Sequence, residues 1–134
     1  MRAVRVVDAS VLIEALIPEG RAHQNAKAEV MAGAMVAPEL IDVEVVSGLR
    51  GLVRGGAVSV PEALQALSAL STWPLTRRPH LPLLPRIWEL RDNLTTYDAS
   101  YVALAEALGC PLVTADARLA AVPGVRCEIV VLGV

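Results

Sequence analysis

Four acidic residues stand at positions where a chain of alternating strands and helices would bring side chains together. Asp8 directly follows a β-branched run, and Asp116 follows a second short apolar run. Asp98 lies in the first turn of a predicted helix, and Glu44 lies inside another. Ligand sites of open parallel sheets form at the carboxyl ends of the strands. We therefore expect these four carboxylates to converge on one site.

Glu44 differs from its neighbour Asp42 by its place on the predicted helix. With 3.6 residues per turn, Glu44 falls at the edge of the apolar face, between Leu40 and the small residues Gly48 and Gly51. Asp42 falls on the far side, where we expect it to face solvent. No Lys or Arg shares the edge that carries Glu44. A carboxylate that faces inward needs a partner, and a metal ion is a candidate.

Carboxylates gathered in this number repel one another. At an effective dielectric constant near 20, each pair at about 5 Å costs on the order of 3 kcal/mol. A fold that is stable by about 5–15 kcal/mol cannot keep four of them ionised and unpaired. Either protons or a divalent cation must relieve the repulsion. An all-oxygen ligand set without His or Cys predicts Mg²⁺ or Mn²⁺.

Each acid also has a purely structural interpretation when it is taken alone. Asp98 could stabilise the dipole of its helix, and Asp116 could be an N-cap. Asp8 could be a turn residue, and Glu44 could be half exposed. The set of four is more informative than any of its members.

The elements that must position these acids alternate between strands and helices. Strands are predicted over residues 3–7, 33–37, 111–114 and 128–132, with a short edge strand within 72–80. Helices are predicted over 10–17, 21–31, 39–54, 61–71, 83–94 and 97–108, with a short one over 116–121. The strands are short and almost wholly apolar, as strands buried on both faces are. The pattern predicts a three-layer α/β/α domain with a mainly parallel, roughly five-stranded sheet.

Composition bounds what such a domain could bind. The length of 134 residues predicts one domain over 1–134, without internal repeats or linkers. Hydrophobic residues make up 54% of the chain and charged residues only 19%, which suggests an apolar surface covered by a partner. The net charge of −2 argues mildly against nucleic acid as a ligand. Of the twelve basic residues, all but Lys27 are Arg, the better phosphate ligand, although genome composition is the stronger explanation of such a bias.

Cysteines and histidines suggest no metal site. Cys110 and Cys127 form no CxxC pair, and we expect both to be buried thiols in a reducing compartment. His23 and His80 are expected at the surface.

No run approaches the roughly 18 apolar residues of a membrane span, and the start of the chain does not resemble a signal peptide. These features predict a cytoplasmic location and no membrane partner.

The surroundings of the four acids resemble the motifs of one family. Residues 6–12, Val-Val-Asp-Ala-Ser-Val-Leu, resemble the opening motif of PIN domains. Residues 38–45 resemble the second motif, with Glu44 as its acid, and 96–105 the third, with Asp98. Residues 112–119 are similar to the fourth, with Asp116. The likeness spans 6–119, although 61–94 matches only in its predicted helices. A compact chain of this length looks like the VapC branch of the family.

This resemblance implies a function and a set of roles. It implies a metal-dependent ribonuclease that hydrolyses RNA phosphodiesters, the toxin of a toxin–antitoxin pair. Asp8, Glu44, Asp98 and Asp116 would be the catalytic and metal-binding residues, with Mg²⁺ or Mn²⁺ as the cofactor. Ser10 and Thr114 would help to hold water on the metal, and Arg118 is either a contact to the substrate phosphate or an ordinary surface residue. The implied partners are an RNA substrate, a small antitoxin that covers apolar helix surface, and a second copy of the chain in a homodimer.

Other enzyme classes fit the residues less well. A haloacid-dehalogenase-like phosphatase needs a second Asp where Ser10 stands, and it needs a late Lys, whereas Lys27 is the only Lys. A receiver domain needs paired early acids and a late Lys, and this chain lacks both. Neither a GxGxxG motif nor a phosphate-binding P-loop follows the first strand. The remaining alternative is a catalytically silent PIN-like module that binds RNA or protein, against which the intact acids argue.

Overall fold

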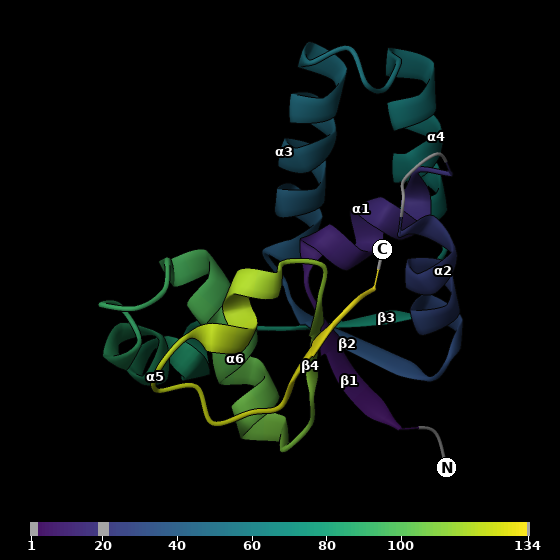
Figure 1. Cartoon of the computed structure of the whole chain (residues 1–134). Coiled ribbons are helices and arrows are strands. Elements are labelled where there is room, and N and C mark those ends of the chain that lie inside the picture. The colour runs from purple at the N-terminus through teal and green to yellow at the C-terminus, as the bar shows by residue number, and fades with distance from the viewer. Residues whose placement is uncertain (1–2, 19–21, 134) are drawn as a thin grey trace.

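The computed structural model describes residues 3–18 and 22–133. Five strands alternate with six α-helices and two 3-10 helices (Figure 1). The strands are β1 (Val4–Val7), β2 (Ala34–Pro38), β3 (Leu75–Arg78), β4 (Leu112–Thr114) and β5 (Ile129–Val131). The helices are α1 (Ala9–Leu16), α2 (His23–Met31), α3 (Ile41–Arg54), α4 (Val60–Leu70), η1 (Leu81–Leu83), α5 (Leu84–Glu89), α6 (Thr96–Leu108) and η2 (Ala117–Ala121).

The five strands form one sheet in the order β3-β2-β1-β4-β5, and every pairing is parallel. β1 is the central strand, with Val6 aligned to Val36 of β2 on one side and to Leu112 of β4 on the other. Because all strands run the same way, the residues that follow β1, β2 and β4 leave the sheet at one edge. The predicted fold class is therefore confirmed.

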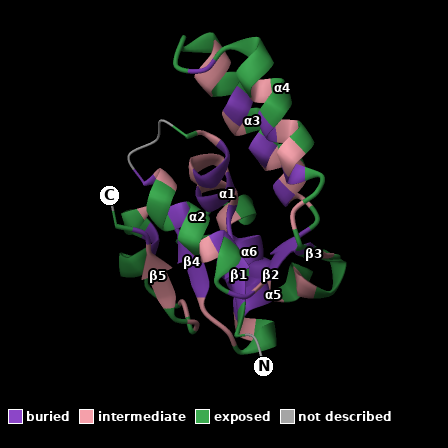
Figure 2. Cartoon of the chain, turned by 90° about the vertical axis from the view of Figure 1, so that its right-hand side faces the viewer, coloured by how far each residue is buried: buried purple, intermediate pink, exposed green. Residues whose placement is uncertain are grey.

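Helices cover both faces of this sheet. α6 packs on β1 and β2, with α5 beside it, whereas α1 lies over the other face and packs against α2 (Figure 1). α3 and α4 form a helical hairpin that projects from the sheet (Figure 1). The strands β1, β2 and β4 are mostly buried, and the far end of the hairpin is exposed (Figure 2). Helix α6 is buried from Ala99 to Ala105, so its position relative to the sheet is closely fixed.

Several predicted boundaries were wrong for local reasons. The helix predicted over 39–54 begins only at Ile41, because the Glu39 N–H still bonds to the Arg78 carbonyl as an extension of the sheet. The helix predicted over 83–94 ends at Glu89 as α5. There the Leu90 N–H is shared between the carbonyls of Arg86 and Ile87, which tightens the last turn. The short helix predicted over 116–121 is the 3-10 helix η2.

The remaining elements follow the predictions within a few residues. The edge strand predicted within 72–80 is β3, which lies at one end of the strand order. The helix predicted over 21–31 is α2, which begins at His23. Arg21 lies outside the described residues. Among the described residues, no helix combines the length and the apolar character that a bilayer span requires.

The predicted environments of the thiols and imidazoles are partly wrong. Cys110 and Cys127 are unpaired but only half-buried, because both line a pocket of about 410 Å³ beside the starts of β4 and β5. His80 is exposed as expected. His23 is half-buried, because its Nδ1 lies 3.0 Å from the carbonyl oxygen of Glu14.

Replacing a fully buried leucine of the sheet is expected to destabilise the fold strongly. Leu112→Ala removes core contacts on β4, and such changes cost about 2–5 kcal/mol. The matched control Leu81→Ala alters an exposed leucine and is expected to change stability by less than about 0.5 kcal/mol. Denaturant-induced unfolding followed by circular dichroism measures both. Equal losses for the two variants would contradict the core described here.

Candidate active site

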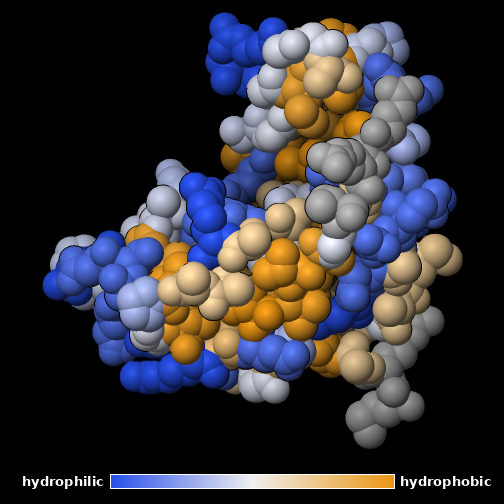
Figure 3. Space-filling view, in the orientation of Figure 1, coloured by the Kyte–Doolittle hydropathy of each residue, from blue (hydrophilic) through white to orange (hydrophobic). Residues whose placement is uncertain are grey.

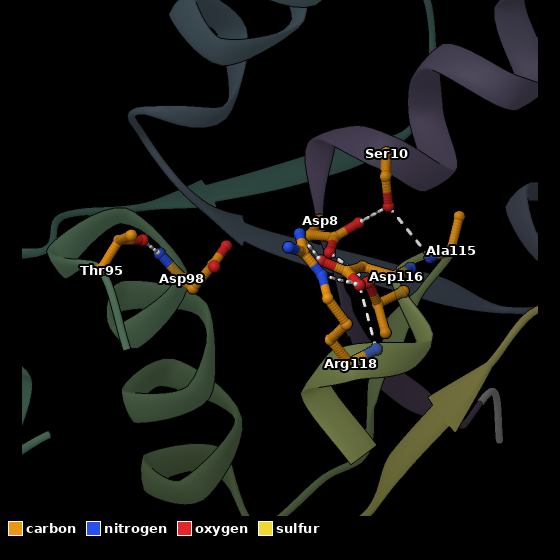
Figure 4. Close-up of polar contacts among 8 residues, drawn as sticks. Asp8, Ser10, Thr95, Asp98, Ala115, Asp116 and Arg118 are labelled. Atoms are coloured by element: carbon orange, nitrogen blue, oxygen red, sulfur yellow. Dashed lines mark hydrogen bonds and ion pairs between the residues drawn. The ribbon is translucent and has the colours of Figure 1, made fainter. Parts of the chain in front are cut away.

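Asp8 is the buried centre of the candidate site. It ends β1 and caps the N-terminus of α1, and only 7% of its surface is exposed. Its Oδ1 accepts a hydrogen bond from the Ser10 hydroxyl at 2.5 Å (Figure 4). The same oxygen accepts one from the Val11 N–H at 3.3 Å. Its Oδ2 accepts a hydrogen bond from the Thr114 hydroxyl at 2.5 Å. Burial nevertheless dominates, and it raises the pKa of Asp8 above the ordinary value of 3.8.

The two hydroxyls beside Asp8 connect it to the end of β4. Ser10 Oγ accepts a hydrogen bond from the Ala115 N–H, and Thr114 Oγ1 accepts one from the Asp116 N–H, both at 3.0 Å. The same hydroxyls therefore donate to the carboxylate and fix the backbone that carries Asp116. Both hydroxyls thus lie against Asp8, and the role in holding metal-bound water that the resemblance implies for Ser10 and Thr114 stays a prediction.

Asp116 lies at the start of η2 and is paired with Arg118. Its Oδ1 accepts from the Arg118 N–H and from Nε, each at 3.0 Å, and its Oδ2 accepts from Nη2 at 2.8 Å. Hydrogen bonds from Arg118 lower the pKa of Asp116. The Arg118 side chain is 90% exposed, so little beyond this ion pair holds it in place.

Asp98 projects from the first turn of α6 toward this ion pair (Figure 4). Its backbone N–H donates to the capping Thr95 hydroxyl at 3.1 Å, which orders the helix start. The pKa of Asp98 is raised, first by burial and then by the negative charge of Asp116. The positive charge of Arg118 acts in the opposite direction.

Glu44 reaches the site from α3 and is held by a residue that the sequence analysis missed. The Tyr101 hydroxyl donates to Glu44 Oε1 at 2.5 Å, and the Tyr101 side chain is almost wholly buried. Burial raises the pKa of Glu44, with further contributions from the charges of Asp98 and Asp8, while the hydrogen bond from Tyr101 opposes the rise. The available signal was a tyrosine one helical turn after Asp98, on the same side of α6.

Asp42 is separate from this group, although it does not simply face solvent. Its two carboxylate oxygens accept hydrogen bonds from Arg77 Nη2 and Nε at 2.8 and 2.7 Å. This pairing directs Asp42 to the edge strand β3. Of the two acids, Glu44 is the one whose pKa is raised by burial and by the charges of Asp98 and Asp8, and its membership of the site stays a prediction.

The four acids interact electrostatically but do not yet form a metal-binding cluster. The negative charge of Asp98 raises the pKa values of Asp8 and Glu44, and Asp116 raises that of Asp98. Among the residues that the structure describes, no three Asp, Glu, His or Cys side chains are placed to hold one metal ion. Asp116 is turned toward Arg118 and Glu44 toward Tyr101, which explains why four facing carboxylates do not occur. The donor set contains oxygen atoms only, and oxygen ligands suit Mg²⁺ or Mn²⁺.

Comparison with known proteins identifies the family. Residues 5–125 match the PIN domain. The chain belongs to the PIN-domain family. All four acids lie within the matched residues, as do Ser10, Thr114 and Arg118.

Curated relatives place this PIN domain in the VapC group. It is 45% identical over 127 residues to Ribonuclease VapC9 of Mycobacterium tuberculosis, covering 95% of this chain and 97% of that protein. It is 44% identical over 125 residues to Ribonuclease VapC1 of the same organism, covering 92% and 94%.

Solved structures support the same fold. PAE2754 from Pyrobaculum aerophilum superimposes with a TM-score of 0.63 at 29% identity, over 90% of this chain and 86% of that one. VapBC-5 from Mycobacterium tuberculosis, a member of the VapBC family of toxin–antitoxin systems, gives a TM-score of 0.57 at 23% identity, over 97% and 99%.

Without a divalent cation, the free energy of unfolding of this PIN domain is expected to fall as the pH rises above the ordinary carboxyl range. The pKa values of Asp8, Glu44 and Asp98 are raised in the folded state above 3.8 for aspartate and 4.5 for glutamate. Between the ordinary and raised values, the folded protein binds more protons than the unfolded chain, so stability decreases with rising pH. The lowered pKa of Asp116 has the opposite effect on stability. Asp116 stabilises the fold above its ordinary pKa, and this contribution is lost as the pH falls.

Denaturation at a series of pH values in EDTA, repeated with Mg²⁺, measures this effect. A cation at about 100 times its Kd should add about 2.7 kcal/mol of stability near neutral pH. The Asp98→Asn variant should show both a weaker pH dependence and a smaller effect of Mg²⁺. A free energy of unfolding that rises with pH throughout this window would contradict the prediction. A free energy of unfolding that neither Mg²⁺ nor Mn²⁺ changes would favour the catalytically silent module.

Proposed function

We propose that this PIN domain is a ribonuclease that hydrolyses RNA phosphodiester bonds with Mg²⁺ or Mn²⁺ at Asp8, Glu44, Asp98 and Asp116. One observation carries the proposal: acids from four separate elements gather at one end of the sheet, and three of them have raised pKa values. Nothing else in the fold requires these charges to be close. Similarity to proteins named as ribonucleases supports RNA as the substrate, and RNA implies a cytoplasmic site of action.

Each residue of the site has a part in this chemistry. When bound, the divalent cation supplies an activated water and neutralises charge on the phosphate. Asp8, Asp98 and Asp116 are the proposed ligands, directly or through water, and Ser10 and Thr114 fix the orientation of Asp8 and hold water nearby. Glu44 either completes the ligand set or orients the attacking water. The hydrogen bond from Tyr101 sets the direction of the Glu44 carboxylate. The raised pKa of Glu44 makes this carboxylate a better proton acceptor.

Arg118 is the counter-ion of Asp116 in the structure. A cation held by Asp116 would take over this neutralisation and would leave the exposed guanidinium able to contact a substrate phosphate in bidentate fashion. Of the two interpretations that the sequence left open, the proposal adopts the contact to the substrate phosphate.

Neutralising the buried acid is expected to abolish cleavage. Even partners in the outer shell of a metal site cost about 10–100-fold in activity when lost, so Asp8→Asn should reduce RNA cleavage by at least ~100-fold. Asp42→Asn is the matched control, because Asp42 lies on α3 but pairs with Arg77 outside the cluster. Cleavage of a structured RNA is measured with Mg²⁺, with Mn²⁺ and with EDTA. Undiminished cutting by Asp8→Asn or in EDTA would indicate a contaminating nuclease and remove the support for this site.

The VapC group further supports a role as the toxin of a toxin–antitoxin pair. Solved neighbours include VapBC complexes. This chain offers an apolar groove of about 380 Å³ between α3 and α4 (Figure 3). Val46, Val60 and Leu64 are exposed along it, which suits an antitoxin segment with an apolar face. A homodimer remains part of the proposal on the family likeness alone.

Expression of the chain alone is expected to arrest growth or to yield insoluble protein, and co-expression with the neighbouring antitoxin should relieve this. Leu64→Asp places a charge in the groove and should weaken the protection without reducing RNA cleavage. Harmless expression of a soluble, active monomer would argue against the toxin role. It would leave the nuclease proposal intact.

A further inference from the structure

One exposed aromatic ring lies beside the acid cluster. The chain has only two Trp, two Tyr and no Phe, and its most exposed rings are Trp88 at 64% and Tyr97 at 62%. Arg91 stacks over the Trp88 ring, with its guanidinium carbon 4.3 Å from the ring centroid. Tyr97 instead directly precedes Asp98 and lines a cleft with Glu44.

This cleft has a volume of about 410 Å³ and separates α3 from the start of α6. Val43, Glu44 and Ser47 of α3 form one side, and Tyr97 of α6 contributes the other. Val43 is largely exposed, so the lining of the cleft includes an apolar side chain, an aromatic ring and the Glu44 carboxylate. Its volume lies within the range of about 300–1,000 Å³ that is typical of small-ligand pockets.

The geometry of α6 explains why the ring faces the site. Tyr97 and Tyr101 are four residues apart, so they project from the same side of the helix. The Tyr101 hydroxyl bonds to Glu44, which shows that this side faces α3. Tyr97 lies one turn closer to the helix start, where the Thr95 cap orders the backbone. The ring is therefore presented at the rim of the acid cluster, on a rigid helix.

An RNA that reaches these acids meets the positive charge of Arg118, which is paired with Asp116. The net charge of the chain is −2, and the acids that would carry out hydrolysis repel phosphate. Phosphate contacts supply most of the affinity in basic nucleic-acid-binding proteins. Base stacking on an aromatic ring contributes about 1–3 kcal/mol per base and does not depend on charge. An unpaired base can reach such a ring, whereas a base inside an RNA helix cannot.

We propose that Tyr97 is a base-stacking residue and that the cleft of Val43, Glu44, Ser47 and Tyr97 binds an unpaired nucleobase of the RNA, next to the phosphate that is cleaved. This inference rests on the proposed ribonuclease function. Stacking on Tyr97 fixes the position of the RNA backbone relative to Asp98, its neighbour in the chain. Tyr97 therefore acts in substrate binding and positioning rather than in the chemical step.

The test measures binding of a fluorescently labelled, single-stranded RNA of mixed sequence by anisotropy. The Asp8→Asn background keeps the RNA intact, and electrophoresis after the measurement verifies this. Tyr97→Ala is expected to raise Kd by roughly 5- to 150-fold, the equivalent of one lost stack. Tyr97→Phe keeps the ring and should change Kd by less than about 2-fold, whereas Tyr97→Leu keeps apolar bulk alone and should behave like Tyr97→Ala. Trp88→Ala is the control for an exposed ring away from the cleft, and its Kd should equal that of the parent.

A second RNA with abasic nucleotides separates stacking from backbone contacts. It should bind weakly and with the same Kd whether or not Tyr97 is replaced. Unchanged affinity of Tyr97→Ala for the normal RNA would overturn the proposal. If Tyr97→Phe lost as much affinity as Tyr97→Ala, the effect would belong to the hydroxyl group. If Tyr97→Ala lost as much affinity for the abasic RNA as for the normal RNA, the effect would belong to backbone contacts. Either result would also overturn the proposal.

Cleavage by the otherwise unaltered protein distinguishes this inference from the function on which it rests. If the chain cuts RNA with Mg²⁺ and Tyr97→Ala leaves KM unchanged, only the stacking proposal fails. If Tyr97→Ala raises KM while kcat is largely retained, the ring acts in binding, as proposed. If the chain neither cuts RNA nor binds Mg²⁺ by calorimetry, the ribonuclease function fails. RNA binding that still depends on the Tyr97 ring would then identify a silent RNA-binding module.

Discussion

The organisation of the site depends on the burial of the Asp8 carboxylate at the end of the central strand. A carboxylate removed from water is costly unless hydrogen-bond donors replace its hydration. Here two hydroxyls and one backbone N–H do so, and they come from the first turn of α1 and from β4. Because the same hydroxyls accept from the N–H groups of Ala115 and Asp116, solvating one acid also fixes the loop that carries another.

The other acids are compensated unequally. Asp116 has Arg118 as its counter-ion, and its pKa is lowered. Glu44 has only a neutral donor in Tyr101, and its pKa stays raised. Among the residues that the structure describes, no basic side chain forms an ion pair with Asp98, and burial and the charge of Asp116 raise the pKa of Asp98. The fold therefore keeps a local excess of negative charge that a divalent cation would relieve, which is the physical argument for the proposed metal dependence at this end of the sheet.

Much of this arrangement could be predicted from local sequence, and the rest depends on packing between distant elements. Asp8 and Asp116 follow short apolar strands, so the parallel-sheet rule places them at one edge. Helical periodicity separates Glu44 from Asp42. The bond between Glu44 and Tyr101 spans 57 residues and exists only because α3 and α6 meet, which no local pattern encodes. The end of α5 at Glu89 likewise depends on how the following turn packs, with Leu90 and Leu94 both buried.

Helix α6 connects the proposed base-stacking residue Tyr97 with the candidate acid Asp98. Its middle is buried on nearly every side, so it cannot shift without disturbing the core. Its first turn is less buried and carries Tyr97 and Asp98 in succession, with Tyr97 lining the cleft and Asp98 projecting toward the other acids. Since both side chains leave the same ordered turn, a base stacked on Tyr97, as proposed, would lie at a fixed distance from Asp98. The proposed binding and chemistry would then be aligned by a single rigid element.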